Sequence, residues 1–258
     1  MIRKLRCTVQ YEGTAFAGFQ RQPGRLTVQG ALESAIARVT RSETVVVGAG
    51  RTDAGVHALG QVIHFSTDSP LPVDTLRRAV NACLPKQAAL TDIAEAPDHF
   101  HARHSAVSRE YRYVVDNGAV RSPLLHGKVH HISQPLAVEA MTEATAVLPG
   151  RHDFGAFGSP MEHALQGAQG EEVTWRGGTI RTLLTAVCRR MHRFVLFCFI
   201  ADAFLRRMVR MLVGTLLRVG AGSLPARALD AMLHGDRSIE AGPAAPAHGL
   251  YLVRVRYE

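Results

Sequence analysis

Apolar and polar residues alternate along the chain with two periods, one typical of strands and one typical of helices. In the first half this pattern predicts strands at Leu5–Tyr11, Thr44–Val47, Gln61–Phe65 and Ala89–Ala94, and helices at Val28–Val39 and Thr75–Leu84. Pro85 ends the second helix, because proline has no backbone N–H to continue it. The predicted order is βαββαβ, the order of a ferredoxin-like unit.

The second half of the chain repeats this order without repeating the sequence. It contains predicted strands at Tyr111–Val115, Leu183–Arg189, Phe194–Ile200 and Leu250–Arg256, and predicted helical regions at Leu136–Leu148, Ala203–Val219 and Pro225–Leu233. Two further segments, Ser159–Gly178 and Ile239–Ala247, are typical of loops. We therefore expect an α+β fold with an N-terminal subdomain at residues 1–104 and a C-terminal subdomain at residues 105–258.

The composition indicates a folded protein with a polyanionic partner. Of the 258 residues, 47% are hydrophobic, and the formal net charge is +8 with a pI near 9.8. The cations are almost all arginine, since lysine occurs only at Lys4, Lys86 and Lys128. Arginine binds phosphates through two hydrogen bonds and stacks on bases, which favours structured RNA, although a GC-rich genome would also raise the arginine content.

The cysteines and the apolar runs argue against several protein classes. Cys7, Cys83, Cys188 and Cys198 are scattered, so neither a zinc ribbon nor a disulfide framework is indicated, and a cytoplasmic location fits. The longest apolar run, Phe194–Ile200, is too short to span a bilayer, so we expect no membrane association.

The stretch at residues 50–58, GRTDAGVHA, places one carboxylate among small residues and an arginine. Gly50 and Gly55 would let a substrate approach Asp53 closely, because they carry no Cβ. Arg51 would keep Asp53 ionised if their side chains meet, and an ionised carboxylate is a nucleophile or a general base. A simple turn with Arg51 in solvent would use the same residues.

Two further patterns could bind RNA. Tyr111 and Tyr113 alternate on a predicted strand and therefore share a face, which suits either base stacking or packing in the core. In the helix predicted from residue 203, Arg206, Arg207 and Arg210 lie opposite the apolar stripe. Such a face either contacts phosphates or is simply solvated.

The histidines do not indicate a metal site. His99, His101 and His104 lack the spacing of a helical ligand pair, and no acidic cluster or cysteine completes a set, so no metal is expected. His57 could pair with Asp53, but no serine or cysteine nucleophile stands out, so a hydrolase of that type is unsupported.

The string at residues 50–58 resembles the catalytic loop of the tRNA pseudouridine synthase A family. Other stretches match the family in order from Tyr11 to Val253, among them Phe16–Gln20, Thr27–Glu33, Phe100–Arg103, Ser108–Tyr113, His152–Phe154, Ala203–Arg210 and Gly249–Val253. His104, Arg206 and Met211 depart from the residues common there.

The resemblance implies the pseudouridine synthase fold, in which two ferredoxin-like halves share a central antiparallel sheet with a cleft between them. It also implies site residues. Asp53 would be the essential carboxylate, Arg210 would pair with it, and Tyr111 would stack on the target uracil. Arg51, Arg206 and Arg207 would bind the substrate.

The implied function is isomerisation of uridine to pseudouridine in tRNA, on the 3′ side of the anticodon stem-loop, by a cytoplasmic homodimer without a cofactor. Three routes stay open for Asp53: attack at C6, addition at C1′, or removal of a ribose proton to give a glycal. Two other classes use the same residues. One is a non-catalytic protein that binds structured RNA, and the other is a metal-dependent hydrolase that uses Asp53 and His57.

Overall fold

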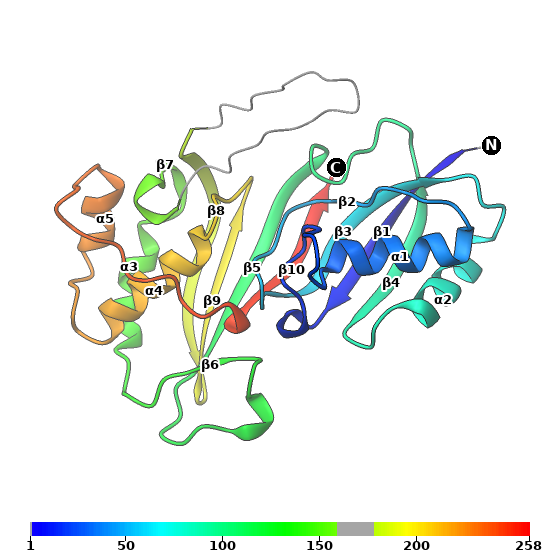
Figure 1. Cartoon of the computed structure of the whole chain (residues 1–258). Coiled ribbons are helices and arrows are strands. Elements are labelled where there is room, and N and C mark those ends of the chain that lie inside the picture. Colours follow the sequence, from blue (N-terminus) through cyan, green and yellow to red (C-terminus); the bar gives the residue numbers. More distant parts are fainter. Residues whose placement is uncertain (1, 159–177) are drawn as a thin grey trace. The chain divides into compact units, whose positions relative to one another are not determined.

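The computed structural model describes residues 2–158 and 178–258 of the chain (Figure 1). The chain forms two compact units. Unit 1 comprises Met1–Val114, Ser122–His130 and Pro246–Glu258, and unit 2 comprises Val115–Arg121 and His131–Ala245. The subdomain boundary predicted after residue 104 was based on the repeated order of strands and helices, and the two units are defined by compactness instead. The predicted boundary therefore stays a proposal. The loop predicted at Ser159–Gly178 lies outside the described residues, except for Gly178.

Unit 1 is an α+β unit built around one sheet. Its strands are β1 (Arg3–Tyr11), β2 (Val47–Gly48), β3 (His57–Thr67), β4 (Ala88–Ala96), most of β5 (Ala106–Asp116) and β10 (Leu250–Tyr257), and its helices are α1 (Val28–Thr40) and α2 (Val73–Cys83). Short 3-10 turns lie at η1 (Gly13–Ala15), η2 (Pro123–Leu125) and η4 (Ala247–Gly249). The strand order is β4-β1-β3-β10-β5, and β2 pairs with β3.

The sheet of unit 1 is mainly antiparallel, as expected, and contains a parallel pair. β3 pairs antiparallel with β1, with Cys7 opposite Ile63. Its other neighbour β10 runs parallel to it, with Tyr251 opposite His57. β10 in turn pairs antiparallel with β5 (Figure 1). The last strand of the chain is therefore an interior strand of this sheet.

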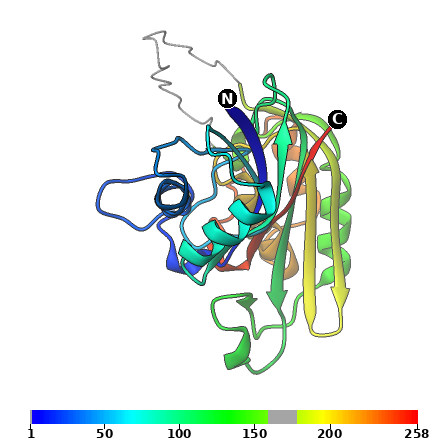
Figure 2. The same cartoon turned by 90° about the vertical axis from the view of Figure 1, so that its right-hand side faces the viewer.

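Both helices of unit 1 pack on one face of its sheet (Figure 2). Thr27 caps α1 by accepting a hydrogen bond from the backbone N–H of Gly30, and the stripe of Val28, Leu32 and Ile36 is fully buried. These side chains join a single cluster with strand residues such as Phe65. Such burial stabilises the fold by about 1.5–3 kcal/mol for each large apolar side chain.

Unit 2 combines three helices with antiparallel strands. The helices are α3 (Val138–Ala146), α4 (Met208–Gly220) and α5 (Ala228–Leu233), and the strands are β7 (Gly150–Asp153), β8 (Ile180–Met191) and β9 (Phe194–Ala201), with a short β6 (His130–His131) at its border and η3 (Gly155–Phe157). β8 lies between β9 and β7, and α3 packs against both β8 and α4. None of the helices among residues 2–158 and 178–258 has the length and apolar character needed to cross a membrane.

Two predicted elements differ from the structure. The strand predicted at Thr44–Val47 is reduced to the two residues Val47 and Gly48, which pair with β3. The helix predicted from Ala203 begins only at Met208, because Arg207 has the left-handed backbone conformation with φ 62°. The expectation that Arg206, Arg207 and Arg210 share one helix face is therefore wrong, since only Arg210 lies on the helix.

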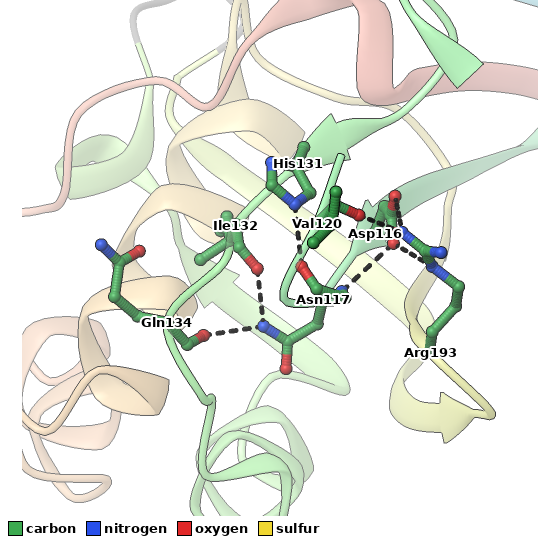
Figure 3. A network of polar contacts seen from close by, with 8 residues as sticks. Asp116, Asn117, Val120, His131, Ile132, Gln134 and Arg193 are labelled. Atoms are coloured by element: carbon green, nitrogen blue, oxygen red, sulfur yellow. Dashed lines mark hydrogen bonds and ion pairs between the residues drawn. The ribbon is translucent and has the colours of Figure 1, made fainter. Parts of the chain in front are cut away.

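A polar network within unit 2 fixes the chain after β5 (Figure 3). The buried carboxylate of Asp116 accepts two hydrogen bonds from the Arg193 guanidinium, at 2.6 and 2.7 Å. Arg193 also donates to the carbonyl of Val120, and the Asn117 amide donates to the carbonyls of Ile132 and Gln134. Burial alone would raise the pKa of Asp116, but Arg193 and the Gly118 N–H hold it below its ordinary value.

Candidate active site

Asp53 lies in the loop between β2 and β3, as the sequence predicts. The loop closes through a turn in which the Val56 N–H donates to the Asp53 carbonyl at 3.1 Å. Gly55 has φ 82°, a left-handed conformation that favours glycine. The start of the loop is held by Gln61, a fully buried residue of β3, whose amide donates to the Gly50 carbonyl at 2.8 Å. The backbone on both sides of Asp53 is thus fixed by neighbouring structure.

Two residues of the segment from Tyr11 to Phe19 form hydrogen bonds with the same loop. The Tyr11 hydroxyl and the Thr52 hydroxyl are hydrogen-bonded at 2.8 Å, and the Phe19 N–H donates to the Thr52 carbonyl at 3.0 Å. Burial raises the pKa of Tyr11 to about 12, so this phenol stays neutral. At Gly13, a Cβ would lie 2.0 Å from the Val56 oxygen, which shows how closely the two backbones approach.

Tyr111 lies on β5 opposite Leu252 of β10 and is partly buried. Burial raises the pKa of Tyr111, and the negative charge of Asp53 acts in the same direction, while Arg109 opposes it. Tyr11 also raises the pKa of Tyr111, and its contribution is larger than that of Asp53. Tyr113, two residues later, is fully buried, and its hydroxyl donates to the Pro246 carbonyl at 2.8 Å. Tyr113 is a core residue.

Three arginines gather near the Asp53 loop in unit 1. Burial lowers the pKa of Arg103, and the charges of Arg51 and Arg109 lower it further. The Arg109 guanidinium donates to the carbonyls of Ala49 at 3.3 Å and Arg103 at 2.7 Å, so it joins the chain before the loop to the segment before β5. A group of guanidinium ions of this kind is suited to a phosphate.

The remaining predicted site residues lie in unit 2. Arg210 is in the first turn of α4, and its Nε donates to the Ala245 carbonyl at 2.7 Å, while the Ala245 N–H donates to the Arg210 carbonyl at 2.9 Å. Arg206 and Arg207 are exposed and precede the helix. The predicted pair of Asp53 and Arg210 would join residues of different units, and it stays a prediction.

Three histidines of unit 1, His64, His101 and His104, pack against one another. The rings of His101 and His104 lie 4.2 Å apart, and His64 lies 4.9 Å from His101. Burial is the main cause of a lowered pKa at all three, to about 4 for His64. Within the described part of the chain, no group of three or more His, Cys, Asp or Glu residues is arranged to hold a metal ion.

The polar residues that support the loop were not found by sequence reasoning. These residues are Tyr11, Thr52, Gln61 and Arg109, which form hydrogen bonds at the loop with partners 11 to 60 positions away, and no spacing rule reveals such partners. Tyr11 and Arg109 do fall within the matched stretches, and Gln61 occupies a fully buried strand position. A polar side chain at a buried strand position is the signal that could have found Gln61, because such groups need a hydrogen-bond partner.

Comparison with known proteins points to one family. A family model described as tRNA pseudouridine synthase matches residues 8–105 and 144–258. Proteins named tRNA pseudouridine synthase A are similar over nearly the whole chain. The protein from Geobacillus sp. (strain WCH70) is 40% identical and covers 100% of both chains. The Syntrophotalea carbinolica protein is 41% identical, with 98% of this chain and 96% of the relative covered. The protein from Roseiflexus sp. (strain RS-1) is 42% identical, with 99% and 91% covered. The chain therefore belongs to the tRNA pseudouridine synthase family.

Proposed function

We propose that this protein converts uridine to pseudouridine in tRNA and that Asp53 is the essential carboxylate. The observation that carries this proposal is the loop itself. Gln61 and Phe19 hold the backbone of this loop, and the Tyr11 hydroxyl holds the side chain of Thr52, the residue before Asp53. The relatives of the chain are named tRNA pseudouridine synthase A. A catalytic group on a fixed backbone is oriented before the substrate arrives, which favours the chemical step.

The reaction exchanges the glycosidic N1–C1′ bond for a C5–C1′ bond within one nucleotide. Because the product is an isomer of the substrate, no cofactor or second substrate is consumed. An ionised Asp53 can act as a nucleophile at C6 or at C1′, or as a base toward the ribose. Each route requires a single well-placed carboxylate.

Tyr111 is proposed to stack on the extruded uracil. Taking a nucleotide out of a helical stem costs about a few kcal/mol, and stacking on an aromatic ring returns about 1–3 kcal/mol for each base. The place of Tyr111 on β5, in the same unit as the Asp53 loop, supports this role. The raised pKa keeps the phenol neutral, so that its charge does not oppose the carboxylate.

The arginines are proposed to divide into two roles. Arg210 pairs with Asp53 and keeps it charged, and its anchorage at the Ala245 carbonyl supports a fixed position for the guanidinium. Arg51, Arg206 and Arg207 bind phosphates, which is consistent with their exposure and with the net charge of +8.

The finer assignments rest on the family resemblance. We propose that the target uridines lie on the 3′ side of the anticodon stem-loop and that the enzyme is a cytoplasmic homodimer. A second subunit, related by a two-fold axis, would bind the elbow and acceptor stem of the tRNA, which lie far from the anticodon arm. Sedimentation at micromolar concentration tests the dimer. A stable and fully active monomer would contradict it.

The decisive experiment is incubation of the purified protein with a tRNA transcript that lacks pseudouridine, followed by mapping of the product nucleotides. We expect pseudouridine in the anticodon arm with the wild-type protein and none with Asp53→Asn. A tRNA that is bound but never converted would favour a non-catalytic RNA-binding protein instead. Loss of activity on addition of a chelator would favour a metal-dependent enzyme.

A further inference from the structure

His57, four residues after Asp53, is buried with 3% of its surface exposed and has three hydrogen-bond partners. Its Nδ1 lies 3.1 Å from the Gly13 backbone nitrogen, and its Nε2 lies 3.1 Å from the carbonyl oxygens of both Gly127 and His248. A backbone N–H can only donate and a carbonyl can only accept. The ring is therefore neutral, with its proton on Nε2.

Two of these partners belong to segments that touch the Asp53 loop directly. Gly13 lies so close to the loop that a Cβ there would be 2.0 Å from the Val56 oxygen. A Cβ at Gly55, in the same loop, would be 3.2 Å from the Cβ of Ala247, the neighbour of His248. One imidazole thus joins two backbone segments that both contact the loop carrying Asp53.

The imidazole is itself held in place by Tyr251. The two residues are opposite each other in the parallel pair of β3 and β10, and their rings are stacked with centroids 4.7 Å apart and planes at 19°. The Tyr251 hydroxyl donates to the Lys128 carbonyl at 2.5 Å, next to the Gly127 carbonyl that His57 binds. The stacked pair therefore fixes the orientation that all three hydrogen bonds of His57 require.

We propose that His57 is a positioning residue for the reaction, whose neutral imidazole holds the segments at Gly13 and His248 against the loop that carries Asp53. This inference rests on the proposed function. His57 does not touch the reacting atoms in this proposal. It acts on the chemical step through the backbone of the loop, so its loss should lower the rate with little change in tRNA affinity.

Protonation of His57 would break the arrangement, because Nδ1 would then carry a proton facing the Gly13 N–H. Burial lowers the pKa of His57 below its ordinary value of 6.5, and the Lys128 ammonium acts in the same direction. The Glu12 carboxylate, 3.8 Å from Nδ1, and the two carbonyl oxygens oppose this shift without cancelling it. The other facing groups, His248 and Tyr251, have shifted pKa values that favour their neutral forms.

His64 provides a matched control on the same strand. It is also buried, with 8% exposed, and its Nδ1 also accepts a backbone N–H, from Ala102 at 3.1 Å. The segment it holds, however, lies before β5 rather than beside Gly13 or His248. Replacement of His64 should therefore cost comparable stability without releasing the contacts at Gly13 and His248. The link from its segment to Ala49 is made by the Arg109 guanidinium rather than by His64.

The test compares His57→Ala, His57→Gln and His64→Gln in single-turnover assays at saturating enzyme, with tRNA affinity and a pH profile for each. We expect His57→Ala to lower the saturated rate by about tenfold or more, since small displacements of catalytic groups are costly, with affinity within about threefold. His57→Gln should retain most of the rate, because its amide supplies both an acceptor and a donor. His64→Gln should change the saturated rate by less than about twofold.

The pH profile keeps the test independent of the alanine variant's stability. Because the pKa of His57 is lowered, the wild-type rate should decline only at a pH lower than 6.5, where His57 binds a proton, and His57→Gln should lack this decline. The same decline in both proteins, or equal rate losses for His57→Gln and His64→Gln, would overturn the proposal. A wild-type protein that forms no pseudouridine would instead contradict the proposed function itself.

Discussion

Replacement of Gly13 by alanine should damage the active site although Gly13 lies outside the loop that carries Asp53. The added Cβ would lie 2.0 Å from the Val56 oxygen and 2.5 Å from the Val56 carbon, both of them backbone atoms. Ordinary contact begins at 3.4 Å, so the two backbones must separate by about 1.4 Å. Overpacking of this kind typically costs about 1–3 kcal/mol, and a displacement of about 1 Å at a catalytic group can lower the rate about a hundredfold.

The assays are thermal unfolding and the single-turnover rate at saturating enzyme. For a chain of this size, a loss of 2 kcal/mol lowers the melting temperature by about 4–8 °C. Gly50→Ala is the control for stability, because a Cβ there meets nothing within 4 Å and Gly50 has no positive φ. Gly50→Ala should melt within about 2 °C of the wild type. If Gly13→Ala kept both the wild-type melting temperature and the wild-type rate, the loop would not depend on this close approach.

Three further outcomes are expected. Asp53→Asn should abolish product formation while the melting temperature and tRNA affinity stay close to wild type, since the amide keeps the shape but is neither nucleophile nor base; near-normal turnover would remove Asp53 from its role. Arg210→Lys should lower the saturated rate far more than it lowers tRNA affinity, because lysine lacks the planar guanidinium. Arg206→Ala should instead weaken tRNA binding and reduce its salt dependence by about one counterion. Equal affinity losses in both variants, with unchanged saturated rates, would contradict the pair of Arg210 with Asp53. The pKa of Asp116 is lower in the folded state, so its contribution to stability is present above pH 3.8 and is lost as the pH falls through the folded-state value. Arg193→Met should weaken this acid dependence, which is measured as the free energy of unfolding at a series of pH values.

Much of the fold could be predicted because apolar periodicity reports which face of an element is buried. The predicted Leu5–Tyr11, Val28–Val39 and Phe194–Ile200 agree with the observed β1, α1 and β9 to within two residues at each end. The strand predicted at Thr44–Val47 failed because β-branched residues favour a strand only where a partner is available. The prediction that the last long helix begins at Ala203 was wrong, because the pattern of apolar residues does not reveal the left-handed conformation of Arg207.

The candidate site was predicted in part. The spacing of residues 50–58 predicted the loop between two strands but left a simple turn equally open, and only the resemblance to a family selected Asp53, whose role stays a prediction. Strand alternation was enough to place Tyr111 and Tyr113 on one face. The residues that hold Asp53 in place were missed. Gln61 and His57 bind backbone atoms that the fold brings to them from up to 191 positions away, and periodicity contains no information on such pairings.

The place of β10 in the sheet has a consequence for how the enzyme is made. β10 contains residues 250–257 and lies between β3 and β5, with Tyr251 opposite His57 (Figure 1). At a synthesis rate of about 5–20 residues per second, about 10–40 s pass between translation of these two partners. During that time β3 and β5 present open edges, which are sites for wrong pairing and aggregation. The support of the loop that carries Asp53 is complete only when residues 250–257 have been added, so we expect a nascent chain that lacks β10 to be inactive on tRNA.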